Sequence, residues 1–225
     1  MQPRSAEERR EGLVELYQEA RACTRCPLYQ GRTKVVFGSG NADADLMFVG
    51  EAPGQQEDLQ GLPFVGRAGK LLDQLLGEVG LERGDVFITN VLKSRPPGNR
   101  DPEPDEIDAC KPYLHKQVEL IEPRVICTLG NFATKLLTRS QRGITSVHGR
   151  PQVHELGGRA VRVFPIYHPA AALRSTKTLE ELREDFQRLP ELLEEPPPVP
   201  IGAVAPVAVV AAEPAPEPPQ INLFD

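Results

Sequence analysis

The sequence lacks any apolar run long enough to cross a membrane, and it begins without the apolar stretch of a secreted protein. No segment approaches the roughly 18 continuous apolar residues of a membrane span. The charged start, MQPRSAEERREG, is unlike a signal peptide. Of the 225 residues, 40% are hydrophobic and 26% are charged, as in an ordinary globular protein. We therefore expect one main domain in a cytoplasmic protein without a membrane partner.

From Glu191 onward the sequence also lacks lysine and arginine. The six acids of this tail account for the whole net charge of −6, so residues 1–190 sum to zero. A body without net charge can still present a basic face to an anionic partner. The cations expected in loops at the ends of strands are Lys93, Arg95, Arg100, Arg174 and Lys177.

Four short apolar runs alternate with helical patterns in the folded part. They cover residues 46–49, 86–92, 124–130 and 162–167. An amphipathic helix over residues 5–22 precedes them, and a last helix ends at about Leu189. Such alternation is typical of right-handed βαβ units. We predict an α/β protein with three α/β/α layers around a four-stranded parallel sheet.

Two acids and an aromatic side chain follow the first expected strand. Glu51 and Glu57 lie six residues apart around a Pro-Gly turn, and Phe64 follows in a loop before the next helix. Ligands of open α/β sheets bind beyond the carboxyl ends of the strands, so this turn is expected to form a pocket wall. A solvated strand-to-helix turn is the plainer alternative.

Four motifs at compatible spacings indicate a family. In order they are GEAPG with a following Glu-Asp, PFVGRAG, ITNVLKSRPPGNRDP and YHPAAALR. Together they resemble a family 4 uracil-DNA glycosylase of bacterial type, the iron-sulfur branch of that superfamily. The resemblance implies a monofunctional hydrolase that cleaves the N-glycosidic bond of deoxyuridine in DNA and so starts base excision repair. It implies uracil-containing DNA as the partner and a monomer that is nucleoid-associated when acting.

Two other functions remain open on the same fold. One is a non-catalytic or weakly active protein that binds uracil or damaged DNA. The other is covalent trapping on the uracil-derived abasic site, for which relatives use a histidine in the loop after the second strand. No histidine lies between Asn90 and Pro104, which disfavours trapping.

The resemblance assigns the uracil contacts. Phe64 would stack on the flipped base, and Asn90 would read its O4 and N3 edge, since an amide offers both a donor and an acceptor. His168 would hydrogen-bond O2 and stabilise the negative charge that grows on uracil. Ala52 would also line the uracil site.

Ala52 replaces the aspartate that other glycosylase families carry at this position. A methyl group cannot orient water, so catalysis should depend on leaving-group stabilisation, with Glu51 or Glu57 placing the water. The loop at residues 168–174 resembles the intercalation loop of the superfamily, in which Leu173 or Arg174 would fill the space left by uracil. A plain helix start after Pro169 is the alternative.

The sequence has only four cysteines: Cys23, Cys26, Cys110 and Cys127. By number they could form one set for zinc or a [4Fe-4S] cluster. The family's third ligand, however, falls in a Lys-Cys-Arg-Pro-Pro motif, where this chain has Ser94. Cys127 lies in an apolar strand and reads as a buried hydrophobe. Three arrangements remain open: three cysteines with Ser94, recruitment of Cys127, or a weakened or absent cluster.

The C-terminal region divides into two parts. Residues 191–219 form a Pro/Ala-rich linker, with nine prolines between residues 196 and 219. Residues 220–225, QINLFD, resemble the clamp-binding peptide of bacterial replication and repair proteins. We expect Gln220, Leu223 and Phe224 to bind a sliding clamp, and residues 1–190 to form the glycosylase domain.

Overall fold

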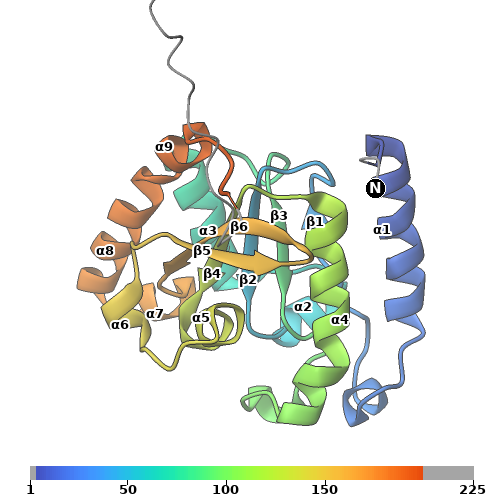
Figure 1. Cartoon of the computed structure of the whole chain (residues 1–225). Helices are drawn as coiled ribbons and strands as arrows, with labels where there is room; N and C mark the ends of the chain where they lie inside the picture. The colour runs from blue at the N-terminus through green and yellow to red at the C-terminus, as the bar shows by residue number, and fades with distance from the viewer. Residues whose placement is uncertain (1–3, 200–225) are drawn as a thin grey trace, which may run out of the picture.

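A six-stranded mixed β-sheet forms the centre of the computed structural model, which describes residues 4–199 (Figure 1). Its strands are β1 (Ser39–Gly40), β2 (Leu46–Gly50), β3 (Phe87–Asn90), β4 (Val125–Leu129), β5 (Gln152–Leu156) and β6 (Arg159–Ile166). They are arranged in the order β1-β3-β2-β4-β6-β5. The four inner strands run parallel, and they are the four apolar runs of the sequence.

The two edge strands correct the prediction of a four-stranded parallel sheet. β1 pairs antiparallel with β3 over two residues, and β5 pairs antiparallel with β6. The hairpin between β5 and β6 turns at Gly157 and Gly158, whose φ angles of 59° and 75° match the twist of the paired strands. β1 is too short, and β5 too polar, to form a recognisable apolar run.

Helices cover both faces of the sheet (Figure 1). The α-helices are α1 (Ala6–Arg21), α2 (Gln55–Gln60), α3 (Arg67–Glu78), α4 (Pro104–Ile121), α5 (Gly130–Thr138), α6 (Ile144–Val147), α7 (Pro169–Ala172), α8 (Thr176–Gln187) and α9 (Leu189–Glu194). Two 3₁₀ helices, η1 (Pro27–Gln30) and η2 (Pro97–Asn99), lie in loops. No helix among residues 4–199 is long and apolar enough to span a bilayer.

Alternating side chains of the inner strands point into two separate cores. Met47 and Val49 of β2 pack in the core that α1 and α4 cover. Leu46 and Phe48 point the other way, into the core formed with α3 and α8. A strand that is buried on both faces reads as a continuous apolar run, which explains why β2 is visible in the sequence.

The carboxyl ends of the parallel strands meet at the lower end of the molecule in Figure 1. The loops after β2, β3 and β6 therefore converge there, although they come from distant parts of the sequence. Helix α2 and the N-terminal end of α4 lie at the same end (Figure 1). This convergence positions the candidate site.

The folded part continues past residue 190, where composition placed the domain boundary. Leu192 of α9 is buried in the core that the sheet forms with α3 and α8. Arg162 forms an ion pair with Glu195 at 2.8 Å, and Arg124 donates to the Glu195 carbonyl oxygen. The expected clamp-binding residues Gln220, Leu223 and Phe224 lie outside the described residues.

Candidate active site

A cleft of about 400 Å³ opens where the loops after β2, β3 and β6 converge. It is lined by Glu51, Ala52, Pro53, Gly54, Glu57, Phe64, Ala68, Pro96, Asn99, Arg100, His168 and Ala170. Five residues that the sequence assigns to catalysis or uracil binding thus share one cavity. Asn90, the sixth, lies directly behind Phe64.

Asn90 ends β3 with its side-chain amide buried and one atom unpaired. Its Oδ1 atom has no hydrogen-bond partner within residues 4–199. A methyl group at Gly50 would lie 2.4 Å from Asn90 Oδ1 and 2.7 Å from Phe64 Cζ, so only glycine leaves room for this approach. A buried polar atom without a partner is rare, and a bound ligand is one way to complete it.

The backbone of Phe64 is held in a conformation that few aromatic residues adopt. Its φ angle is 52°, in the left-handed region. Arg83 donates from Nη1 to the Pro63 oxygen at 2.9 Å and from Nη2 to the Phe64 oxygen at 2.6 Å. A Cβ at Gly69 of α3 would lie 1.7 Å from the Phe64 oxygen, so this glycine is required for the fit. The Phe64 ring is thereby fixed at the cleft.

Glu57 has a structural contact as well as a place in the cleft. Its Oε1 atom accepts hydrogen bonds from the backbone amides of Val65 and Gly66, both at 3.0 Å. Gly66 is the N-cap of α3, where a carboxylate is favoured by the exposed amides of the helix. Glu57 therefore ties α2 to the loop that presents Phe64, and its second oxygen remains for a ligand.

His168 follows β6 and stacks against Phe64, with ring centroids 5.6 Å apart. Its Nδ1 atom accepts a hydrogen bond from the Ala170 amide at 3.0 Å, so the ring proton lies on Nε2. Burial lowers the pKa of His168 to about 4, which keeps the imidazole neutral at pH 7. The site thus holds a neutral ring with one N–H group to donate.

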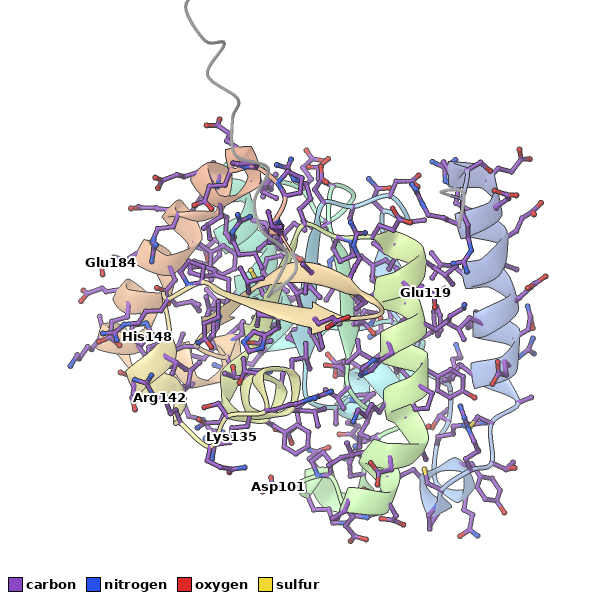
Figure 2. All side chains as sticks on the ribbon, viewed as in Figure 1. Asp101, Glu119, Lys135, Arg142, His148 and Glu184 are labelled. Carbon is purple, nitrogen blue, oxygen red and sulfur yellow. The ribbon has the colours of Figure 1, made fainter. Side chains whose placement is uncertain are left out.

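Glu51 is a half-buried carboxylate on the β2 side of the cleft. Burial, and to a lesser extent the negative charge of Asp101, raises the pKa of Glu51. Figure 2 shows Asp101 at the lower end of the molecule, near the start of α4. A raised pKa makes the Glu51 carboxylate a stronger base than an exposed glutamate. Its neighbour Ala52 adds only a methyl group to the cavity wall.

Lys93 does not belong to the basic face that the sequence predicted, because it is only 2% exposed. Its ammonium donates to Thr89 Oγ1, the Asn90 carbonyl oxygen and Gln117 Oε1, each at 2.7 Å. Three acceptors satisfy its three protons, which is how a lysine can be buried. Burial lowers the pKa of Lys93 to about 7. The buried ammonium therefore helps to fix the backbone that carries the Asn90 amide.

The expected intercalation residues lie beside the cleft. Helix α7 begins at Pro169 and extends for only four residues, and Leu173 is its C-cap. The Leu173 side chain is 40% exposed, and Arg174 is exposed as well. The structure therefore leaves an exposed apolar side chain three residues beyond Ala170, which lines the cleft.

Cys23, Cys26 and Cys110 line a second, smaller cavity together with Ser94, which we call the cysteine corner. The first two follow α1, Cys110 lies on α4, and Ser94 follows β3. Within the described part of the chain, no three His, Cys, Asp or Glu residues are grouped to hold a single metal ion.

The thiols of the cysteine corner have unequal acidities. Burial opposes ionisation of Cys23, but hydrogen bonds from Tyr113 and Arg25 outweigh it and lower the pKa of this thiol. Burial raises the pKa of Cys26 and of Cys110. Cys23 is therefore the thiol of the corner that ionises most readily.

Cys127 is separated from the cysteine corner by the sheet. It is fully buried in β4 and packs in the core formed with α3 and α8. Cys23, Cys26 and Cys110 pack against the opposite core. The strand order also places β3 and β4 on opposite sides of β2, as expected from the resemblance. Ser94, and not Cys127, lines the corner with the three other cysteines.

Comparison with known proteins identifies the family. Residues 37–190 match the family model of the uracil DNA glycosylase superfamily, which is more than half of the chain. The chain belongs to the uracil-DNA glycosylase superfamily.

Within this superfamily, several similar proteins are type-4 uracil-DNA glycosylases. The type-4 uracil-DNA glycosylase of Sulfurisphaera tokodaii is 49% identical over 81% of this chain and 85% of its own length. Those of Archaeoglobus fulgidus and Thermotoga maritima are 47% and 46% identical, over 81% and 80% of this chain and 94% of each relative. These relatives are archaeal and bacterial, so they do not confirm the expected bacterial type.

Some residues that shape this glycosylase site are absent from the sequence-based prediction. Arg83 and Gln117 carry no charge pattern or motif that distinguishes them, because their roles depend on contacts with residues distant in the sequence. Gly50 opens the GEAPG motif, but the motif alone does not show that a side chain at this position would collide with Asn90 and Phe64. Arg83 lies in a surface-like segment and gave no signal.

Proposed function

We propose that this uracil-DNA glycosylase excises uracil by holding the flipped base against Phe64 and stabilising it as a leaving group. The glycosylase activity follows from the family and its type-4 relatives; the residue roles are the proposal. The unpaired Oδ1 atom of Asn90 is the observation that carries it. In this assignment Oδ1 accepts from uracil N3–H, and the amide nitrogen donates to O4.

His168 completes the contacts with uracil. When the bond between N1 and C1′ breaks, its electron pair stays on uracil and negative charge grows on O2. The Nε2–H group of His168 donates to that oxygen, because Nδ1 already accepts from Ala170. A neutral donor that is already oriented stabilises the developing charge without giving up its proton.

Water must then add to C1′, and Glu51 is the carboxylate we assign to it. Glu51 is half-buried with a raised pKa, whereas one oxygen of Glu57 is committed to the amides of Val65 and Gly66. Glu51 orients the water and takes its proton as the new bond to C1′ forms. Glu57 faces the positively charged sugar and also holds the Phe64 loop.

A single-turnover assay with alkaline cleavage of the product tests these roles. Glu51→Gln should lower the excision rate by about 100-fold or more, while binding to a non-hydrolysable deoxyuridine oligonucleotide stays near the parental value. Glu57→Gln should also lower turnover more than binding. Glu155→Gln, an exposed change on β5, is the control. A full single-turnover rate in Glu51→Gln would remove Glu51 from the mechanism, and the same result in Glu57→Gln would remove Glu57.

We further assign Leu173, with Arg174 beside it, to the space that uracil leaves in the duplex. A wedge is needed only where a stack must be filled, so Leu173→Ala should slow excision from duplex DNA more than from a single strand. An equal loss on both substrates would contradict the assignment.

The proposed cofactor is a structural [4Fe-4S] cluster at the cysteine corner. Cys23, Cys26 and Cys110 would hold it, with Ser94 as an oxygen ligand or a vacant fourth position. When bound, such a cluster would cross-link α1, α4 and the loop after β3. Iron content and electron paramagnetic resonance of Ser94→Cys, compared with the parent, test the occupancy of that position.

We also propose that residues 220–225 bind a sliding clamp. Deletion of these residues should abolish clamp binding without changing excision from a short oligonucleotide. Equal clamp binding by the shortened protein would contradict the proposal. The monomeric state and the nucleoid-associated cytoplasmic location stay predictions from the sequence.

A further inference from the structure

A second groove lies at the C-terminal end of α2, the helix that also borders the cleft. It encloses about 710 Å³. Its walls come from the C-terminal end of α1, the segment around η1, and the residues that follow α2. The lining residues are Tyr17, Arg21, Tyr29, Arg32, Thr33, Lys34, Val35, Gln60, Gly61 and Leu62. Glu57 of α2 lines the cleft, and Gln60 at the C-terminal end of the same helix lines the groove, so α2 forms part of the wall of both.

The groove is positively charged although the chain carries a net charge of −6. Arg21, Arg32 and Lys34 line it, and its lining includes no acid. None of these three side chains forms an ion pair within residues 4–199. The nearest aspartate, Asp58, is buried and accepts from the Thr33 amide at 3.0 Å. The three positive charges are thus left for an anionic partner.

Two tyrosines accompany these cations. Tyr17 is 37% exposed and Tyr29 is 41% exposed, which are high values for aromatic side chains. Tyr17 packs edge-on against Phe37, with ring centroids 5.8 Å apart, so its position is fixed. Basic side chains interleaved with exposed aromatic rings are the pattern by which proteins bind single-stranded nucleic acid.

We propose that this groove binds the unpaired DNA next to the uracil nucleotide, with phosphates on Arg21 and Lys34 and a base stacked on Tyr17 or Tyr29. The proposal rests on the uracil-DNA glycosylase activity and adds a subsite to it. Helix α2 has six residues, which corresponds to about 9 Å of helix. An unpaired strand is more extended than the roughly 3.4 Å per nucleotide of a duplex strand, so the groove begins within about three nucleotides of the flipped base.

The charge and the shared wall select DNA over other occupants. A strand whose uracil enters the cleft must leave it past one of the walls, and α2 is the wall that leads to uncompensated positive charge. An acidic protein segment would satisfy the charge, but it would not be tied to the cleft. The test therefore uses DNA length as its variable.

Binding to uracil-free single-stranded DNA, measured by fluorescence anisotropy over a range of salt concentrations, tests the cations. Each phosphate contact contributes about 0.7 to the slope of log K against log salt on single strands, so Arg21→Gln/Lys34→Gln should lower the slope by about 1.4. Lys116→Gln/Arg150→Gln removes the same charge from α4 and the loop before β5, and should leave the slope unchanged. A parental slope in the Arg21/Lys34 variant would overturn the proposal.

Excision from oligonucleotides of two lengths tests the distance. With one nucleotide on each side of uracil, the Arg21/Lys34 variant and Tyr17→Leu should cut at the parental rate, because the strand does not reach the groove. With ten on each side, kcat/KM should fall for both variants. An equal loss at both lengths, or a loss on duplex DNA alone, would overturn the proposal. Failure of the parent to cut at either length would instead contradict the proposed function.

Discussion

The cleft and the cysteine corner are built around the same loop after β3, yet they differ in how complete they are. In the cleft, the acids, the aromatic ring and the histidine line one cavity, with the amide of Asn90 against them. At the corner, three thiols meet one hydroxyl, that of Ser94. The loop starts with Asn90 and reaches Ser94 four residues later.

This difference shows which contacts the fold supplies by itself. The position of Asn90 is set by β3, by the glycine at position 50 and by the buried ammonium of Lys93, none of which needs a metal. The corner depends on side chains that a metal would draw together. A chain can therefore lose one metal ligand and keep the geometry of the cleft.

The largest expected effect comes from a substitution in the cleft that leaves the cysteine corner unchanged. Asn90→Asp preserves the shape of the side chain but offers uracil O4 a negative charge in place of a donor. A buried charge without a matching partner costs roughly 3–4 kcal/mol, which corresponds to a 100- to 1,000-fold slower single turnover. Asn131→Asp is a matched control, because the Asn131 oxygen accepts from the Ile144 amide outside the cleft. A rate within threefold of the parent would contradict the reading role of Asn90.

A smaller effect follows from adding one methyl group between the two side chains that hold uracil. Gly50→Ala places a Cβ against Asn90 and Phe64, so the ring or the amide must move. Overpacking of this kind lowers stability by about 1–3 kcal/mol. Calorimetry should show a lower Tm. The excision rate should also fall at temperatures where the variant is still folded. Gly77→Ala, where a Cβ meets nothing within 4 Å, is the control.

A fourth cysteine at the cysteine corner tests the other half of the comparison. Ser94→Cys should raise iron per chain and slow its loss to a chelator, since thiolate is the preferred cluster ligand. Cys127→Ser should leave iron unchanged, because this residue lies across the sheet. Excision by Ser94→Cys should stay near the parental rate. Loss of iron in Cys127→Ser with a folded protein would contradict the assignment of the corner.

The smallest effect concerns the pH dependence of the cleft. The negative charge of Asp101 helps to hold the pKa of Glu51 above its usual value, and protonation of Glu51 removes the base. Asp101→Asn should therefore lower this pKa and move the acidic limb of the single-turnover profile to lower pH. Asp108→Asn, an exposed change on α4, should leave the limb in place. A shift to higher pH would contradict the role of Glu51.

Sequence patterns predicted the inner strands and the side chains that directly follow them. The inner strands are buried on both faces and read as apolar runs, and the side chains at their ends meet by topology. The edge strands β1 and β5 have no such run, because one is two residues long and the other lies partly in solvent. Lys93 looked like a surface cation because its three acceptors come from positions up to 24 residues away.

That buried lysine also joins the two regions of the comparison. Its ammonium donates to the Asn90 carbonyl oxygen, and the same residue lines the cysteine corner. A change at Lys93 should therefore disturb both regions, whereas a change confined to Ser94 leaves the cleft in place. If the corner holds the proposed cluster, a cell short of iron would lose the cross-link among α1, α4 and this loop before it lost the cleft.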